Sequence, residues 1–356
     1  MSPGSRELRP LADLAVSILP LLVFTISCTR STSPGDAVPC GNVRWQVTEQ
    51  WGEAWNPAGD SIICVSAENG RGEYAPGIYI VDVRTGCWRN ALPRTGSIRA
   101  TPMTCQWHPR LRTVLLTYGV FVGVLDLNTL GISPFSDGDH GIDIAIWSPE
   151  GDSIWYDRDL ANTDPAWWGG LWIQAAGGGP PRPFRPADGS VVGPQGMAFS
   201  PDGGTLAYAA LADSFLDAQG QLVFQSNEIF TIRRDGARRV RLTHLNGAAR
   251  NPRWIFGGRE LMFDYVARNC AGALGNPERQ LLSVDVTTGH LRSWPQALGS
   301  ATFQFSFPPM PDPTGTRLLF VADGGPRQDG ATVGQLYVTP LHPLNPRRLF
   351  SPDSLH

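Results

Sequence analysis

One motif recurs six times along this chain, and the repetition restricts the possible folds more than any other feature of the sequence. Each copy has an aromatic or apolar anchor residue, a short turn usually rich in proline and glycine, and then an apolar run of strand-like composition. The anchors follow one another at intervals of roughly 50 residues and are Trp55, Trp107, Trp147, Phe199, Trp254 and Pro311. Because proline fixes φ and glycine adopts positive φ, such a turn lets one strand reverse directly into the next.

Every copy continues beyond the apolar run in a similar way. A second strand-like segment follows, as at residues 77–83 and 280–286, and three copies then reach a turn that ends in Thr-Gly or Thr-Leu-Gly. Four short strands repeated at this period are typical of one blade of a β-propeller, whose faces are buried only when blades stack around an axis. The sequence therefore predicts an all-β fold, a six-bladed β-propeller with four antiparallel strands in each blade.

The turns also resemble those of a known family. A Trp or Phe followed by Ser-Pro, an acidic residue and Gly, and then by an apolar strand, is similar to the repeat of TolB-type propellers. The match is closest at 147–151 and 199–203, good at 55–59, and looser at the other anchors. The resemblance implies the six-bladed fold but little about function, because propellers carry unrelated activities. Too few residues separate Cys28 from the first anchor for the N-terminal domain of TolB, so we expect the chain not to be TolB itself.

The first residues have the pattern of an export signal. Arg6 and Arg9 precede an apolar run over 14–27, which ends in a small residue, Ser27, directly before Cys28. The pattern resembles a bacterial lipoprotein signal, which implies cleavage before Cys28 and a lipid on its thiol; an ordinary secretory signal is the alternative. We therefore expect three regions, namely a signal peptide at 1–27, a flexible tether at 28–42 and the propeller at 43–356.

Composition and missing motifs exclude several classes of protein. The chain contains no lysine, so a phosphate-binding P-loop, a Schiff-base lysine and a Ser-Lys nucleophile pair are ruled out. The net charge of −3 leaves no basic excess for binding nucleic acid. The motifs G-x-S-x-G and H-E-x-x-H and any zinc-like Cys/His spacing are missing too, so we predict no catalytic residue, metal or cofactor.

Cysteine usage agrees with export but leaves the disulfide pairing open. Apart from Cys28 the number of cysteines is odd, so at most two disulfides form and one thiol stays free. Cys64 and Cys105 lie within predicted strands, where a buried unpaired cysteine is the alternative to a disulfide. The candidates for pairing are Cys40, Cys64, Cys87, Cys105 and Cys270.

The predicted propeller has one regular face and one irregular face. Most connections between second and third strands are long, at 67–76, 157–169, 211–227, 266–279 and 322–334. Rigid scaffolds tend to carry function on such loops, so we expect binding on this face, although neutral growth of the loops is the alternative. Trp167 and Trp168 lie on one of these loops and are candidate contacts for a protein partner or a sugar, unless they cap the edge of the blade.

Further candidates precede two of the anchors, where connections between blades approach the axis. His140 and Asp143, before the third anchor, suit acid/base chemistry or ligand binding. Arg250 and Asn251, before the fifth anchor, suit an anionic ligand. Solvated loops are the alternative in both places. The tryptophan anchors themselves are interpreted as core residues rather than as a ligand-binding set, because they recur at one position of the blade.

Two smaller predictions concern a cation and the closure of the ring. The acidic loop that contains Asp157, Asp159 and Asp164 could offer oxygen ligands to Ca²⁺, but it lacks EF-hand spacing and a solvated loop is favoured. Val43–Val47 alternates like a strand, and we predict that it pairs with the last blade near 347–350.

These observations leave two classes of function. The leading hypothesis is an exported, lipid-anchored propeller that acts as a protein-binding or scaffolding module at the cell envelope. It would be held in the outer membrane through Cys28, facing the periplasm or the cell surface, with an envelope protein as its partner. The alternative is an exported enzyme, or a protein that binds a glycan or another small ligand, with its site at the mouth of the axis. An enzyme is the less favoured of the two because no catalytic motif is present.

Overall fold

The computed structural model describes most of the repeat region. It covers residues 54–66, 77–93, 104–118, 121–135, 141–142, 144–158, 170–216, 222–245, 247–267, 279–294, 297–298, 301–302, 310–326, 332–341 and 347–348. Within these ranges the regular structure is β-strand, apart from a 3₁₀ turn, η1, over Phe256–Gly258. The predicted all-β class is therefore confirmed.

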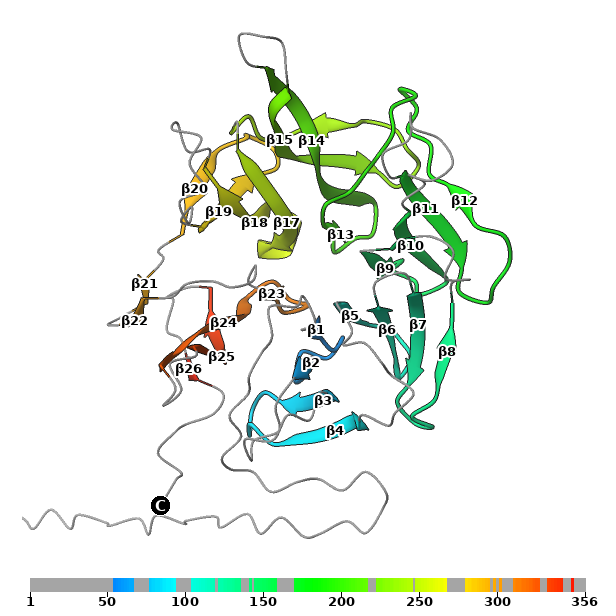
Figure 1. The fold of residues 1–356 in the computed structure, drawn as a ribbon, viewed down its shortest axis with the longest axis vertical. Coiled ribbons are helices and arrows are strands. Elements are labelled where there is room, and N and C mark those ends of the chain that lie inside the picture. The colour runs from blue at the N-terminus through cyan, green and yellow to red at the C-terminus, as the bar shows by residue number, and fades with distance from the viewer. Residues whose placement is uncertain are drawn as a thin grey trace, which may run out of the picture.

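The sheets surround a central axis, and the first strand of each repeat lies nearest to it (Figure 1). Each of the first three repeats forms a four-stranded sheet whose strands follow one another in chain order. The first sheet contains β1 (Ala54–Trp55), β2 (Ser61–Ser66), β3 (Gly77–Asp82) and β4 (Trp88–Pro93). The second contains β5 (Thr104–Trp107), β6 (Thr113–Tyr118), β7 (Phe121–Asp126) and β8 (Ile132–Pro134). The third contains β9 (Ala145–Trp147), β10 (Ser153–Arg158), β11 (Gly170–Ala175) and β12 (Arg182–Pro183).

The fourth and fifth repeats share one eight-stranded sheet. Its first half contains β13 (Met197–Phe199), β14 (Thr205–Leu216), β15 (Leu222–Arg233) and β16 (Val240–Arg241). Its second half contains β17 (Ala248–Ile255), β18 (Glu260–Val266), β19 (Arg279–Asp285) and β20 (Leu291–Ser293). The halves meet at a single parallel pair, Asn227 with Ala248. A short ladder of β21 (Ala297–Leu298) and β22 (Ala301–Thr302) precedes the last sheet, which contains β23 (Met310–Pro311), β24 (Arg317–Pro326), β25 (Thr332–Pro340) and β26 (Arg347–Arg348).

The polar residue that follows most anchors closes the turn into the next strand. The Asn56 side-chain oxygen accepts hydrogen bonds from the backbone N–H groups of Asp60 and Ser61, at 3.1 and 3.0 Å. The Ser148 hydroxyl does the same for Ser153 at 3.1 Å. These residues replace backbone partners that a tight turn cannot supply, which is why Asn, Ser and Asp are favoured at such positions.

The turn glycines are required for two reasons. Gly203 has a φ of 72°, a conformation that residues with a side chain rarely adopt. A Cβ atom added there would also lie 2.9 Å from the ring of Pro149, in the turn of the preceding repeat. The turn therefore reverses the chain and also lets neighbouring sheets approach closely.

The apolar core lies between neighbouring sheets. Ile63 and Ile78 of the first sheet pack with Val114 and Leu116 of the second in one cluster. Comparable clusters join the second sheet to the third, the third to β13–β15, β14–β15 to β17–β19, and β17–β19 to β24. Each sheet thus buries its faces against its neighbours around the axis, as blades of a propeller must.

Two tryptophan anchors also link neighbouring sheets by hydrogen bonds. The indole Nε1 of Trp254 donates to the Ala198 carbonyl at 3.0 Å, and that of Trp55 donates to the Met310 carbonyl at 3.0 Å. Ala198 and Met310 each stand one position before the anchor of the adjoining repeat. The same position of the motif therefore supplies the acceptor at both joints.

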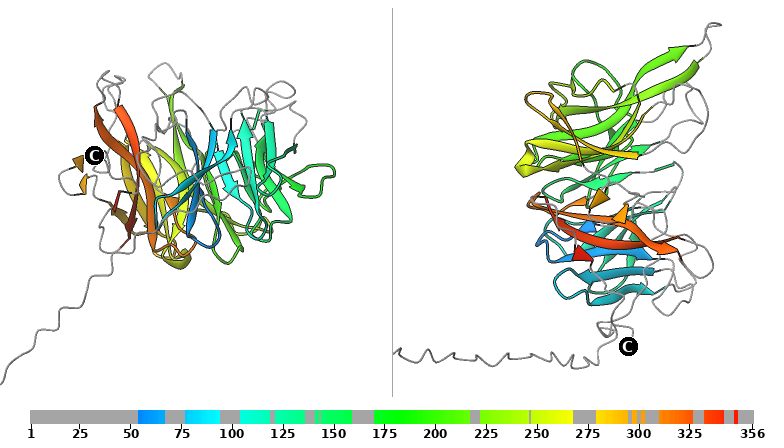
Figure 2. Two further views of the ribbon diagram at one scale, coloured as in Figure 1. Left: turned by 90° about the horizontal axis from the view of Figure 1, so that it is seen from below. Right: turned by 90° about the vertical axis from the view of Figure 1, so that its left-hand side faces the viewer.

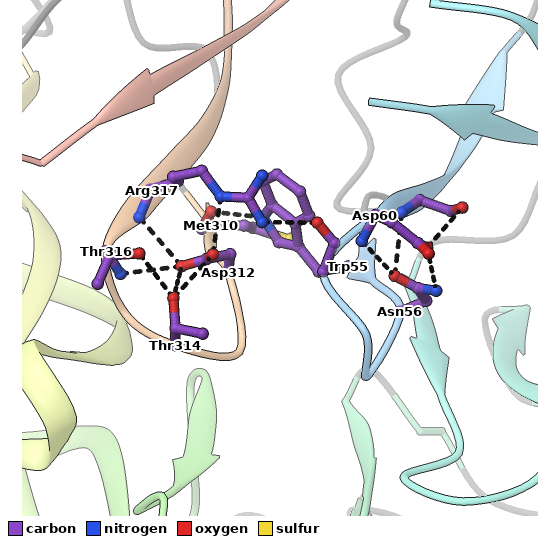
Figure 3. A network of polar contacts seen from close by, with 10 residues as sticks. Trp55, Asn56, Asp60, Met310, Asp312, Thr314, Thr316 and Arg317 are labelled. Atoms are coloured by element: carbon purple, nitrogen blue, oxygen red, sulfur yellow. Dashed lines mark hydrogen bonds and ion pairs between the residues drawn. The ribbon is translucent and has the colours of Figure 1, made fainter. Parts of the chain in front are cut away.

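The first and last sheets are joined by a polar clasp built around Arg317 (Figure 3). Its Nη2 donates to the Gly59 carbonyl at 2.6 Å, and its guanidinium carbon lies 4.9 Å from the centre of the Trp55 ring. Its Nε donates to Asp312 at 2.9 Å, which holds the guanidinium in place. The predicted closing strand at 43–47 lies outside the described residues, so that pairing stays a prediction.

The described part of the chain settles two points about cysteine and membrane segments. Cys87 is in a disulfide, whereas Cys105 is buried and is not disulfide-bonded, as the strand position of Cys105 allowed. Cys40 and Cys270, and the side chain of Cys64, lie outside the described residues. No helix in the described ranges is both long and apolar enough to span a bilayer.

The indole hydrogen bond of Trp254 yields a stability prediction. Trp254→Phe should lower the free energy of unfolding by about 1 kcal/mol, because the partly buried Ala198 carbonyl loses its donor. Trp147→Phe is the matched control, since the Trp147 Nε1 is buried and has no hydrogen-bond partner. Urea unfolding of both variants measures the difference, and equal losses would show that the bond itself contributes nothing.

The clasp should be sensitive to acid. Burial raises the pKa of Asp312, but the backbone amides of Arg317 and Thr316, with the Arg317 and Thr314 side chains, outweigh it and leave the pKa below its usual value. A depressed pKa adds stability that is complete above the unfolded pKa of about 4 and is lost as the pH falls through the folded pKa.

Asp312→Asn removes this titration. The wild-type protein should therefore lose more of its unfolding free energy than the variant does when the pH falls from about 5 to about 3. Denaturant unfolding at a series of pH values measures both curves. Curves that stay parallel below pH ~4 would contradict the assignment.

Candidate functional site

The inner strands of all the repeats enclose a cavity of about 720 Å³ on the axis. Its wall is formed by residues of β1, β5, β9, β13, β17 and β23, the strands that Figure 1 shows nearest the centre. This volume falls within the range of small-molecule sites, which is roughly 300–1,000 Å³. The cavity is therefore the best-formed candidate site in the described part of the molecule.

Much of the wall is apolar. Trp55, Trp107, Trp147 and Phe199 border the cavity, together with Met197. The anchors Trp107 and Trp254 are half-buried, whereas Trp55 and Trp147 are 8% and 5% exposed and thus buried as expected. Their position at the axis was not anticipated, because burial between blades and burial against an axial cavity leave the same pattern in the sequence.

Arg250 and Asn251 line the cavity, although they lie within β17 rather than on the connection that precedes it. Arg250 is exposed, whereas Asn251 is only 4% exposed. The Asn251 Nδ2 donates to the Asp264 carboxylate at 3.0 Å, and its backbone N–H donates to the Gln195 carbonyl at 3.4 Å. Asn251 therefore builds the wall, and Arg250 is the residue of this pair that is available to a ligand.

Asn251 also has an unusual backbone. Its φ is 54°, in the left-handed region that disfavours residues with a side chain, and the pairing of β17 with β18 is interrupted between Arg250 and Arg253. Such a bulge inserts extra residues into one strand and changes the direction of the side chains that follow. The close approach of Gly196, where a Cβ would lie 2.7 Å from the Asn251 Cα, leaves no room for an ordinary residue there.

Arg253 is a wall residue that was not among the predicted site residues. Its Nη1 donates to the carbonyl oxygens of Met197 and Pro252, at 3.3 and 3.0 Å. Burial lowers the pKa of Arg253, and the Asp264 carboxylate partly opposes that effect. A signal for it exists in the sequence. The residue directly before the anchor is uncharged in the other repeats, namely Ala54, Gln106, Ile146, Ala198 and Met310, and only here is it an arginine.

Asp157 is the acidic residue of the described wall. It was predicted on an acidic loop, and it lies in β10, where its Oδ1 accepts the backbone N–H of Ile144 at 2.7 Å. Its carboxylate therefore fixes the entry into β9. Asp159 and Asp164 lie outside the described residues, and within the described ranges no group of three or more His, Cys, Asp or Glu side chains is arranged to hold a metal ion.

Several predicted residues cannot be placed. Cys28, His140, Asp143, Trp167 and Trp168 all lie outside the described residues. The roles suggested for His140, Asp143, Trp167 and Trp168 therefore stay predictions. Of the candidate set, the structure brings together Arg250 and Asn251, and it adds Arg253 and Asp157 to the same cavity.

Comparison with known proteins identifies the architecture. No protein-family model matches the sequence, and no curated protein matches it. Among solved structures, a putative TolB from Agrobacterium tumefaciens has a TM-score of 0.55 at 18% identity, covering 76% of this chain and 87% of that one. TolB from Acinetobacter baumannii has a TM-score of 0.50 at 15% identity, covering 83% of this chain and 64% of that one.

A third similar structure comes from a nidogen/laminin complex. Its TM-score is 0.53 at 12% identity, and the match covers 83% of this chain and 95% of that one. Identities this low show the fold alone. The chain therefore folds as a β-propeller similar to those of TolB proteins, and its low identity to them agrees with the expectation that it is not TolB itself.

Proposed function

We propose that this chain is an exported, lipid-anchored propeller that binds a partner protein at the cell envelope. The hairpin of β14 and β15 is the observation that carries this proposal. Both strands have 12 residues, whereas β2, β3, β6, β7, β10 and β11 have 6 each. The hairpin consequently extends beyond the neighbouring sheets (Figures 1 and 2).

The exposure of the side chains changes where the hairpin leaves the ring. Leu206, Ala207, Tyr208 and Ala209 are fully buried, whereas Leu211, the next apolar residue after Ala210, is 46% exposed. The pairing of β14 with β15 continues beyond Leu211, and Phe215 lies opposite Phe224 in the register. Ala212 still packs against the core of its blade, whereas the exposed Leu211 is available to another molecule, so contact with a partner is the function that this extension suits.

Other observations support the export part of the proposal. The disulfide at Cys87 is typical of proteins that fold in an oxidising compartment, such as the bacterial periplasm. The signal-like run before Cys28 supplies the route, and a lipid on Cys28 supplies the anchor. One of the structurally similar chains comes from a complex between two proteins, nidogen and laminin, which shows that this fold is compatible with a protein partner.

A six-bladed ring is part of the proposal. The eight-stranded sheet consists of two halves with four strands each, joined at one residue pair, and we count these halves as the fourth and fifth blades. The remaining four-stranded sheets supply the other blades. The Arg317 clasp supports closure of the ring between the first blade and the last.

A small-ligand function is the second candidate, and the axial cavity favours it. A volume of about 720 Å³ with an arginine-containing wall is suited to an organic anion. This possibility is compatible with partner binding, because the hairpin and the cavity are separate parts of the molecule.

The partner-binding role predicts that Leu211→Asp abolishes complex formation. Its control is Leu111→Asp, because Leu111 is 60% exposed and lies in the turn between β5 and β6, at the opposite end of its blade. A charge at Leu211 disrupts an apolar contact, whereas the same charge at Leu111 leaves the loop face unchanged. Crosslinking in intact cells, followed by mass spectrometry, measures which proteins are attached to each variant.

A partner captured by the wild type and by Leu111→Asp, but reduced at least tenfold with Leu211→Asp, is the expected result. Circular dichroism and thermal unfolding check that both variants fold alike. If Leu211→Asp retains every partner of the wild type, this face is not the binding surface.

The lipid anchor has its own test. Cys28→Ala should eliminate incorporation of a clickable fatty acid and move the protein from the membrane fraction to the soluble fraction, because the thiol that carries the lipid is gone. Cys105→Ala is the control, since Cys105 is buried inside the propeller and is not disulfide-bonded. Labelling of the Cys28→Ala protein at the wild-type level would disprove the anchor.

A further inference from the structure

The axial cavity contains an arginine, Arg253, that forms no ion pair with a described residue. Two carbonyl oxygens, of Met197 and Pro252, accept the hydrogen bonds of Arg253. The described ion pairs join other arginines to other carboxylates and do not include Arg253. Arg253 is half-buried, and the Asp264 carboxylate acts on it without forming an ion pair. Partial removal of a guanidinium from water is costly, so an anion that pairs with Arg253 would stabilise it.

The donors that Arg253 leaves unused have the geometry of a carboxylate site. Both printed bonds start from Nη1, so Nε and Nη2 make no hydrogen bond to a described residue. These two nitrogens form one edge of the planar guanidinium, and that edge can donate two parallel hydrogen bonds to a carboxylate. Lysine could not provide this arrangement, because an ammonium is a point charge without a planar fork.

A bulge in β17 positions Arg253 at the cavity. The register of β17 with β18 runs from Arg250 opposite Asp264 to Arg253 opposite Met262, with a bulge between them. The bulge depends on the positive φ of Asn251 and on its side-chain bond to Asp264.

The charges at the wall favour a ligand with a single negative charge. The charged residues that line the cavity are Asp157, Arg250 and Arg253, and the Asp264 carboxylate lies opposite Arg250 and acts on Arg253. Because two carboxylates already oppose the two arginines, one further carboxylate is easier to accommodate than a phosphate dianion. Trp107, Ile146 and Met197 line the rest of the cavity and suit an apolar or ring-shaped body.

We propose that the axial cavity binds a small organic monocarboxylate, with the Nε/Nη2 edge of Arg253 holding the carboxylate and Arg250 assisting at the mouth. The apolar wall receives the remainder of the ligand. This site is separate from the partner-binding hairpin, so it stands or falls independently of the proposed protein partner.

Benzoate is the probe for the test, with benzamide as its neutral isostere and inorganic phosphate as a second anion. Binding to the full mature chain is measured by ligand-observed NMR and isothermal calorimetry. We expect benzoate to bind at least tenfold more tightly than benzamide or phosphate. Equal binding of benzoate and benzamide, or no benzoate binding, would overturn the proposal.

Variants assign the site to Arg253. Arg253→Gln should weaken benzoate binding at least tenfold, and Arg253→Lys should restore only part of it because the fork is lost. Leu211→Asp should bind benzoate as the wild type does, which separates this site from the partner-binding face. Unchanged benzoate affinity in a folded Arg253→Gln protein would refute the assignment.

A measurement without ligand guards against variants that fail to fold. Because Arg253 forms no ion pair with a described residue and methionine keeps much of its apolar stem, Arg253→Met should have a melting temperature close to that of the wild type. Added benzoate should raise the melting temperature of the wild type but not that of Arg253→Met. A variant that melts well below the wild type would show a structural role and contradict the proposal.

Discussion

Burial of both faces of each short sheet is the physical requirement on which this structure depends. A sheet of four short strands has two apolar faces, and neither is covered by its own blade. The clusters between successive sheets show how the requirement is met, since Ile63 packs against Leu116 in one gap and Phe263 packs against Ala207 in another. Arranging the sheets around an axis follows from this mutual burial, and so does the convergence of their first strands. The axial cavity is therefore a consequence of this packing. A few charged and polar residues of its wall determine which ligands it suits.

Anchor tryptophans form hydrogen bonds between neighbouring sheets, but the atoms that take part differ from one pair of sheets to the next. Trp55 and Trp254 donate across their joints, whereas the buried indole nitrogen of Trp147 has no partner and the Trp147 backbone N–H instead binds the Gln106 side chain at 2.6 Å. Between the first and last sheets, Arg317 adds a charged clasp to the indole bond. Polar bonds cross other joints as well, since Arg234 pairs with Glu150 and Arg253 donates to the Met197 carbonyl, so each joint is held by a different set of atoms.

Features that depend on neighbouring residues could be predicted, and those that depend on distant ones could not. The turns and anchors follow from Pro, Gly and capping side chains within a few residues, so the all-β class and the position of Trp55 or Trp147 in a strand were accessible. The role of Arg253 was not, because it depends on which strand borders the cavity and on the bulge at Asn251. Arg250 was identified for its charge, although its strand was taken for a connection. The 12-residue length of β14 was hidden because its sequence reads equally well as a loop.

The long hairpin has one more consequence, which concerns its backbone. β13 pairs with β14 only as far as Tyr208, and β16 pairs with β15 only at Phe230 and Thr231. Backbone hydrogen bonds to neighbouring segments continue as far as Ala209 on β14 and Asn227 on β15. Beyond those two residues, the outer edges of the hairpin have no strand neighbour in the described structure. Open edges offer a row of N–H and C=O groups to which an extended segment of another chain can add as an extra strand. Recognition through main-chain groups places few demands on side chains, so the proposed binding role is compatible with changes in the sequence of the hairpin.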